Sequence, residues 1–243
     1  MERIPSTMKI GEMTSAEFKR KVRPSSVVIL PIGAIEEHGP HLPLCTDCIQ
    51  PVTVAQLAAE RTGAFVAPLL PYGVCTSTRD FPGTITISFD ALRMVVRDIL
   101  SEFVRNGFRN IVVLTGHAGR EHVAALRVAA KEIVDRHLVK IAVLSDYDII
   151  YDLALVPPED GHAGTGETSR ILQERPQLVK GFPAEQMNRS PKYAVLADSK
   201  AYWRGFTGDP SKATKKLGKS LDETVVRELV KIIRDMKKWR VKG

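Results

Sequence analysis

Short apolar runs alternate along the chain with longer stretches in which apolar side chains repeat at helical spacing. The apolar runs are rich in β-branched residues and cover residues 26–32, 64–70, 110–116 and 139–145. Helical spacing is found in residues 51–61, 90–106 and 121–137, and a last long helix is predicted for residues 212–239. Strand and helix patterns that alternate in this way predict an α/β fold with a mostly parallel sheet.

The strand candidates are continuously apolar, which is typical of strands that carry helices on both faces of the sheet. The helical pattern is clearest in residues 90–106, where Asp90 is the expected N-cap and Gly107 the expected C-cap. The sequence shows no internal repeat, low-complexity tract or linker. We therefore expect residues 1–243 to form a single domain.

Composition limits the classes of protein that remain. The 243 residues are 44% hydrophobic, and no apolar run approaches the roughly 18 residues that cross a bilayer. We expect a cytoplasmic protein without a membrane partner, and the three cysteines fit a reducing compartment better than a disulfide framework. The net charge of +7 is spread along the chain, so it indicates a solvated surface rather than nucleic-acid binding, although it can also attract an anionic substrate.

Ligand-type side chains follow three of the four predicted strands. In open α/β sheets, ligands bind beyond the carboxyl ends of the strands, so these side chains are expected to converge. They are Glu36, His38 and Asp47 after the first strand, His117 after the third, and His162 and Glu167 after the fourth.

The types of these residues predict a metal site. Glu36 and His38 are two residues apart, so in an extended segment both point to the same side of the chain. Asp47 can return to them through a bend, and with His117 they make a mixed nitrogen and oxygen set suited to zinc, manganese or iron(II). Adding Glu167 supplies enough ligands for two ions that share one carboxylate, an arrangement that activates water for hydrolysis.

Other motifs in the chain do not support alternative chemistry. Cys45 and Cys48 have Cys-x-x-Cys spacing, but a structural zinc site needs four ligands and only Cys75 is left, so packing is preferred over a redox pair. In "HAGREH", Glu121 and His122 have the wrong spacing for a zinc protease and are expected to begin the next helix. A Gly-x-Ser-x-Gly nucleophile elbow is missing from the sequence.

Five segments in order along the chain resemble the creatininase family of metal-dependent amidohydrolases. They are "PIGAIEEHGPHLPLCTD", "FPGTITIS", "LTGHAG", "DGHAGTGETS" and "GFTGDPSKATKKLGK". This resemblance implies a three-layer αβα sandwich around a mostly parallel sheet, a two-metal site that hydrolyses an amide bond, and a homo-oligomer, often a hexamer.

The resemblance also implies a role for each matching residue. Glu36 and His117 look like ligands of one ion, His38 like a ligand of the other, and Asp47 like the bridge between them. The family's further glutamate falls at Gly119 here, and Glu167 is our candidate for the vacated position. His162 aligns with the histidine that assists proton transfer, so His162 and Glu167 are the predicted catalytic pair.

Departures from the family pattern concern the substrate. Ser77 and Thr78 stand where many members carry Glu-His, and Thr165 replaces a glutamate of the last motif. The tryptophans that pack against creatinine have no evident counterpart near His162, because Trp203 lies far along the sequence. These differences favour an amide other than creatinine.

The sequence therefore predicts a hydrolase with two divalent ions (zinc, manganese or iron(II)) that cleaves a non-peptide or cyclic amide by a two-metal-activated hydroxide. Two alternatives stay open. One is a deformylase of a formylamino-pyrimidine nucleotide, in which Arg79 meets the phosphate; the other is a metal-binding oligomeric scaffold without catalysis, suggested by Gly119.

Overall fold

The fold is built on one parallel sheet of five strands. The structure, a computed structural model, describes residues 8–187 and 198–239. The strands lie in the order β1-β3-β2-β4-β5, and every neighbouring pair is parallel. Their bounds are β1 (Met8–Lys9), β2 (Val27–Ile32), β3 (Phe65–Val66), β4 (Asn110–Thr115) and β5 (Lys140–Ser145).

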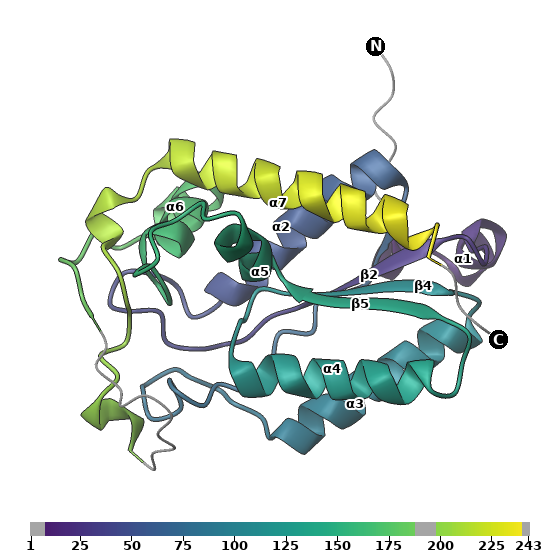
Figure 1. Ribbon diagram of the computed structural model, residues 1–243, viewed down its shortest axis with the longest axis horizontal. Helices are drawn as coiled ribbons and strands as arrows, with labels where there is room; N and C mark the ends of the chain where they lie inside the picture. Colours follow the sequence, from purple (N-terminus) through teal and green to yellow (C-terminus); the bar gives the residue numbers. More distant parts are fainter. Residues whose placement is uncertain (1–7, 188–197, 240–243) are drawn as a thin grey trace.

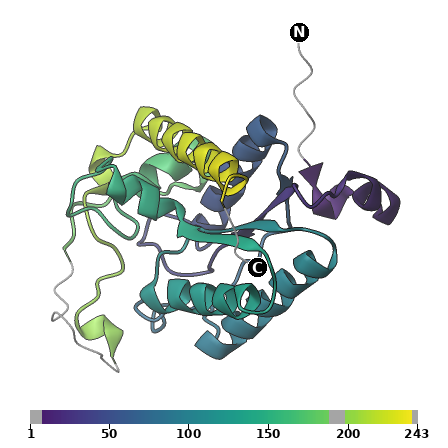
Figure 2. The same ribbon diagram turned by 45° about the vertical axis from the view of Figure 1, so that its right-hand side comes forward.

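Helices cover both faces of this sheet, as Figures 1 and 2 show. One face carries α2 (Thr46–Thr62), α5 (Asp146–Asp152) and α7 (Lys215–Met236), and the other carries α3 (Phe89–Arg105) and α4 (Arg120–Val134). The remaining elements are α1 (Ser15–Lys21), α6 (Thr165–Glu174) and the 3₁₀ turns η1 (Ile10–Glu12), η2 (Pro176–Leu178), η3 (Ser199–Ala201) and η4 (Pro210–Lys212).

The continuous apolarity of the strands follows from this layering. In β2, Val27 and Ile29 point into the core beneath α2 and α7, whereas Val28 and Leu30 point into the core above α3 and α4. All four side chains are at most 2% exposed. The predicted α/β class with a parallel sheet and helices on both faces is confirmed.

The second predicted strand is much shorter than expected, because only Phe65–Val66 of residues 64–70 form a regular ladder. Pro68 has no N–H to donate to a neighbouring strand, and a proline interrupts a ladder for that reason. The chain still runs along β2, since the Ala67 amide donates to the Ile29 carbonyl and the Leu70 amide donates to the Pro31 carbonyl.

Helix ends differ from the predictions by a few residues. The helix expected at 51–61 begins earlier, at Thr46, so Asp47 lies in its first turn rather than in a loop. The N-cap of α3 is Ser88, whose hydroxyl accepts from the Ala91 amide, and not Asp90. Gly107, the expected C-cap, lies one residue beyond the C-cap Asn106 and has a φ of 100°, which a glycine adopts readily.

Three helices were not predicted, and α6 matters most for the site. Residues 159–169 were expected to form a polar loop, but the helix begins at Thr165, so Glu167 lies in its first turn. The hydrophobic pattern does not reveal the short helix α1, but a local capping motif marks its start. Thr14 and Glu17 form a capping box, in which each side chain bonds the other's backbone amide.

Close contact with α7 holds α6 in place. A Cβ atom added to Gly218 in α7 would lie 2.1 Å from the Ser169 carbonyl oxygen, so only glycine allows this approach. The Thr214 amide, at the N-cap of α7, donates to the Ser169 hydroxyl at 3.1 Å. The first turn of α6, with Glu167, is therefore fixed relative to the sheet edge.

None of the helices in the described ranges is both long enough and apolar enough to span a bilayer.

Candidate metal centre

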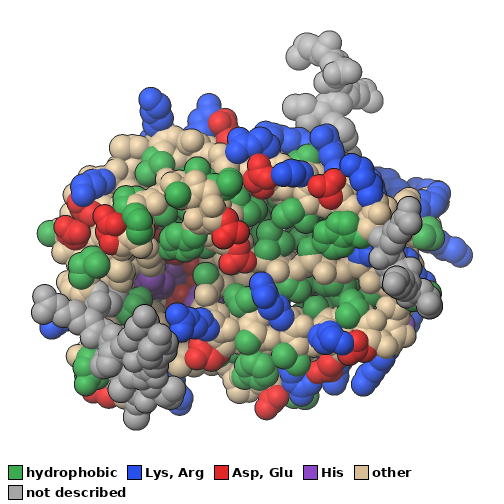
Figure 3. All heavy atoms as spheres, viewed as in Figure 1, with side chains coloured by type: hydrophobic (Ala, Val, Ile, Leu, Met, Phe, Trp, Pro, Cys, Tyr) green, Lys and Arg blue, Asp and Glu red, His purple; other side chains and the backbone are tan. Residues whose placement is uncertain are grey.

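The predicted ligands meet at the carboxyl ends of β2 and β4. From β2 the chain crosses through α2 to β3 on one side, and from β4 it crosses through α4 to β5 on the other, so the crevice opens between these two strands. Figure 3 shows histidine and acidic side chains at the floor of a hollow on this face. The cavity has a volume of about 280 Å³ and is lined by Glu36, Asp47, Ser77, His117, Ala118, Gly119, Tyr147, Tyr151, His162, Glu167 and Trp203.

One half of the centre is built around His117. Its Nε2 lies 3.0 Å from the Val74 carbonyl oxygen, which can only accept, so the ring hydrogen belongs to Nε2. The lone pair of Nδ1 then faces two carboxylate oxygens, Glu36 Oε1 at 2.7 Å and Asp47 Oδ2 at 3.1 Å. Three electron-rich atoms approach one another so closely only when a cation, either a proton or a metal ion, lies among them.

The other half repeats this arrangement around His38. Its Nδ1 lies 3.0 Å from the Glu36 carbonyl oxygen, so Nδ1 carries the hydrogen and Nε2 is free. Nε2 faces Asp47 Oδ1 at 3.0 Å and Glu167 Oε2 at 3.4 Å. Asp47 thus contributes one oxygen to each half.

The electrostatics of both halves favour a cation. Burial opposes charge on His38, but the carboxylates of Asp47 and Glu167 outweigh it and raise the pKa of His38 to about 10. Burial likewise opposes charge on His117, yet Glu36 and Asp47 raise its pKa well above the ordinary value. The surroundings that favour a proton on each ring also favour a divalent ion in its place.

Two opposing effects act on the pKa of Glu167. Burial raises its pKa to about 8, while the positive charge of His38 works in the opposite direction. Its Oε2 also accepts a hydrogen bond from the Ala163 amide at 2.6 Å, which fixes the carboxylate at the second half of the centre.

Glu167 occupies a part of the centre that a side chain at position 119 cannot reach. A Cβ atom added to Gly119 would lie 2.5 Å from His117 Nε2, so even an alanine there would displace the ring. The glutamate of the family pattern is therefore incompatible with this orientation of His117, and a carboxylate arrives from α6 instead.

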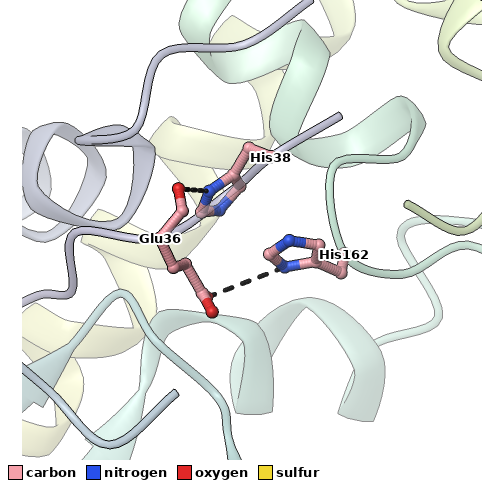
Figure 4. A group of neighbouring side chains, drawn as sticks. All are labelled: Glu36, His38 and His162. Carbon is pink, nitrogen blue, oxygen red and sulfur yellow. Dashed lines mark hydrogen bonds and ion pairs between the residues drawn. The ribbon is translucent and has the colours of Figure 1, made fainter. Parts of the chain in front are cut away.

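Figure 4 shows that His162 faces Glu36 and His38, and the ring centroids of His162 and His38 are 4.2 Å apart. Its Nε2 is 2.6 Å from the Glu37 carbonyl oxygen, and its Nδ1 faces Glu36 Oε1 at 3.8 Å. Burial and the neighbouring charge of His38 lower the pKa of His162 to about 4, so the ring is neutral. Its Nδ1 thus offers a lone pair to the cavity.

Four functional candidates were missed or left unassigned by the sequence. Thr78 is buried and donates to Glu36 Oε2 at 2.5 Å, and Cys75 lies beside Glu36 and His117. Ser77 lines the cavity, as does Trp203. The Trp203 ring centroid is 5.7 Å from that of His162, so a tryptophan does lie near His162, contrary to the expectation from the sequence. Only Ser77 and Thr78 could have been suspected from the sequence, because they occupy the positions at which many family members carry Glu-His.

Three further polar residues lie outside the centre. His41 is buried against Phe206 with its Nε2 2.9 Å from Thr168 Oγ1, and it does not line the described cavity. Glu37 binds the Gly39 amide at 2.6 Å, which agrees with a side chain directed away from the ligands. Arg79 is exposed and also absent from the described lining.

Comparisons with known proteins agree with this geometry. The family model described as "Creatininase: Creatinine amidohydrolase" matches residues 11–233. Creatinine amidohydrolase of Pseudomonas putida is 33% identical over 189 residues, which cover 70% of this chain and 73% of that protein. Mycofactocin precursor peptide peptidase of Mycolicibacterium smegmatis is 32% identical over 250 residues, which cover 95% of this chain and 91% of that protein.

Solved structures show the same relationship. A crystal structure of creatinine amidohydrolase (creatininase) has 28% identity and a TM-score of 0.85, and the match covers 95% of this chain and 98% of that one. Two other similar structures are described as "Creatininase Mn" and as a Zn-Zn type of a creatininase mutant.

The fold and the clustered carboxylates and imidazoles define a hydrolase with its centre at one edge of a parallel sheet. The chain belongs to the creatininase family. The family, the three-layer fold and the enzyme class expected from the sequence, a hydrolase of carbon–nitrogen bonds other than peptide bonds, are confirmed.

Proposed function

We propose that this chain hydrolyses the carbon–nitrogen bond of a small non-peptide or cyclic amide with the help of two divalent ions. Glu36, Asp47 and His117 would hold one ion, and His38, Asp47 and Glu167 the other. The observation that carries the proposal is the position of Asp47, whose two oxygens each lie about 3 Å from the free nitrogen of a different imidazole. Zinc and manganese both accept this mixed donor set, and similar structures are described with each.

Two bound ions would supply Lewis acidity, which lowers the pKa of water and polarises the amide carbonyl. The chain supplies the proton transfer. With Nε2 held by the Glu37 carbonyl, His162 presents Nδ1 as an acceptor for the proton of the attacking water, and it can then pass this proton to the leaving nitrogen. Glu167 fixes the backbone next to His162, because its Oε2 accepts a hydrogen bond from the Ala163 amide.

The cavity walls indicate the size and kind of substrate. A volume of about 280 Å³ fits a small molecule or the end of a chain, and Tyr147, Tyr151 and Trp203 supply flat aromatic surface. Tyr147 is 3% exposed, and its hydroxyl has no hydrogen-bond partner among the described residues, so it is available to a polar group of the substrate. A compact planar amide with an acceptor atom matches these walls.

A substrate panel tests the proposal. The purified chain, stripped with a chelator and reloaded with zinc or manganese, is assayed with creatinine, other cyclic amides, a formylamino-pyrimidine nucleotide and a short peptide. We expect metal-dependent release of a carboxylate from a cyclic or small amide. Formate from the nucleotide would favour the deformylase, cleavage of the peptide alone would favour a peptidase, and no turnover with both ions bound would favour the scaffold.

Thr78 provides a more specific prediction about the first half of the centre. The substitution Thr78→Val keeps the shape of the side chain but removes the hydrogen bond that orients Glu36. We expect the affinity for one of the two ions to fall by roughly 10- to 100-fold, the usual effect of losing such an orienting partner, while the other ion is retained. Competitive chelator titration followed by metal analysis measures this. Thr62→Val, at the far end of α2, is the matched control, and equal affinity in the two variants would contradict the role of Thr78.

A further inference from the structure

Cys75 lies at the first half of the centre, although nothing in its sequence spacing marks it. It is 1% exposed, and its amide donates to Thr86 Oγ1 at 2.9 Å, which fixes the backbone at this point. Ligand atoms of Glu36, Cys75 and His117 lie within 4.8 Å of one another. A sulfur atom therefore faces the same small space as a carboxylate oxygen and an imidazole nitrogen.

The backbone beside Cys75 also orients the imidazole. The Val74 carbonyl accepts the hydrogen of His117 Nε2, so Nδ1 points toward Glu36. Glu36 Oε1 is buried and faces His117 Nδ1 at 2.7 Å, while Thr78 holds the other oxygen of that carboxylate. Residues 74–78 thus bring a thiol, an imidazole nitrogen and a carboxylate oxygen together.

The surroundings of Cys75 differ from those of an ordinary packing cysteine in the same protein. Cys48 Sγ contacts two carbonyl oxygens, those of Ala34 at 3.4 Å and Pro71 at 3.8 Å, which satisfy its weak S–H donor. Cys75 instead faces the carboxylate of Glu36 and the imidazole of His117, two groups that bind divalent ions in proteins.

We propose that the Cys75 thiolate is a further protein ligand of the ion held by Glu36 and His117, and that it makes this half of the centre selective for thiophilic ions. The inference rests on the proposed function and goes beyond it. When the ion binds, the S–H bond breaks, the proton leaves to solvent and a sulfur–metal bond forms, with no change of oxidation state. Zinc, cobalt(II) and cadmium would be preferred over manganese and magnesium, which favour oxygen ligands.

The two halves of the centre would then be unequal. Glu36, Asp47, His117 and Cys75 would give the first ion four protein ligands, the number typical of a closed tetrahedral site. His38, Asp47 and Glu167 would give the second ion three, which leaves a position for substrate or water. The first ion would be held more firmly by the chain, and the second would keep more positions open for water or substrate.

Cobalt(II) tests this assignment without any substrate, because a cobalt–thiolate bond produces a charge-transfer absorption in the near ultraviolet. The full chain, stripped of metal, is titrated with cobalt(II) alone. We expect the absorption in the unchanged protein and in the control variants Cys45→Ser and Cys48→Ser, and its loss in Cys75→Ser and Cys75→Ala. In an equal mixture of zinc and manganese, Cys75→Ser should lower the bound zinc-to-manganese ratio roughly tenfold or more.

Cadmium-113 NMR of the unchanged protein gives a reading that does not depend on any variant, since sulfur and oxygen ligands produce well-separated resonances. Two bound cadmium ions with one sulfur-type resonance would support the proposal. Two bound ions without such a resonance, or a cobalt absorption that persists in Cys75→Ser, would overturn the role of Cys75 and leave the proposed hydrolase intact. A chain that binds no divalent ion would overturn both.

Discussion

Replacement of Asp47 by alanine is expected to remove both ions and the hydrolytic activity together. Asp47 Oδ1 lies 3.0 Å from His38 Nε2 and Oδ2 lies 3.1 Å from His117 Nδ1, so one substitution deletes a ligand from each half. The fall in activity should exceed the roughly 10- to 100-fold that loss of an orienting partner causes. Metal analysis after gel filtration, together with turnover of the best substrate in the panel, measures both effects.

Matched substitutions distinguish loss of one ion from loss of both, and so test the bridging role of Asp47. Glu36→Gln should release only the first ion and Glu167→Gln only the second, while Asp47→Asn, which keeps the shape of the side chain, should behave like alanine. Cys48→Ser, at the next residue of the same helix, should keep both ions. Two ions retained without the Asp47 carboxylate would contradict the bridge, and two ions retained in Glu167→Gln would contradict the assignment to α6.

The parts of the centre that the sequence predicted are those with local geometric causes. Glu36 and His38 directly follow a buried strand, and His117 follows the strand beside it, so the rule of strand ends places them together. Their alternation also separates Glu37 from the ligands. These inferences need only the periods of local structure and the parallel pairing of strands.

The contributors that the sequence missed or left unassigned depend on tertiary contacts. Cys75 reaches Glu36 and His117, and Trp203 reaches the cavity, through irregular segments whose paths have no hydrophobic period to reveal them. Glu167 was a candidate ligand from its place after the fourth predicted strand, but the sequence did not show how it reaches the centre. Its position depends on the start of α6 at Thr165 and on the close approach of Gly218 in α7, neither of which the hydrophobic pattern contains.

A buried ion network behind the centre connects the helices that carry it. Arg170, on α6 one turn beyond Glu167, is 0% exposed. Its Nε donates to Asp222 on α7 at 2.6 Å, and its Nη1 donates to Asp146 on α5 at 2.7 Å and to Gln50 on α2 at 3.2 Å. One guanidinium therefore balances two buried carboxylates and joins four helices.

Removal of this guanidinium is expected to have the largest effect on stability. Arg170→Met keeps much of the buried volume but leaves Asp146 and Asp222 as unpaired charges, so the free energy of unfolding should fall by about 3 to 5 kcal/mol. Urea denaturation in the presence of a chelator measures this without a contribution from metal binding. Exposed Arg105, which pairs with Glu102, is the control, and Arg105→Met should change stability by less than about 1 kcal/mol.

The origin of the loss can be separated from simple misfit of the methionine. If unpaired charge is the cause, adding Asp146→Asn and Asp222→Asn to Arg170→Met should recover much of the lost stability, because the two buried charges are then absent as well. If the triple variant is no more stable than the single one, packing and hydrogen-bond geometry dominate instead of charge. Because Arg170 anchors the helix that carries Glu167, we also expect Arg170→Met to weaken binding of the second ion more than the first, even where the variant is fully folded.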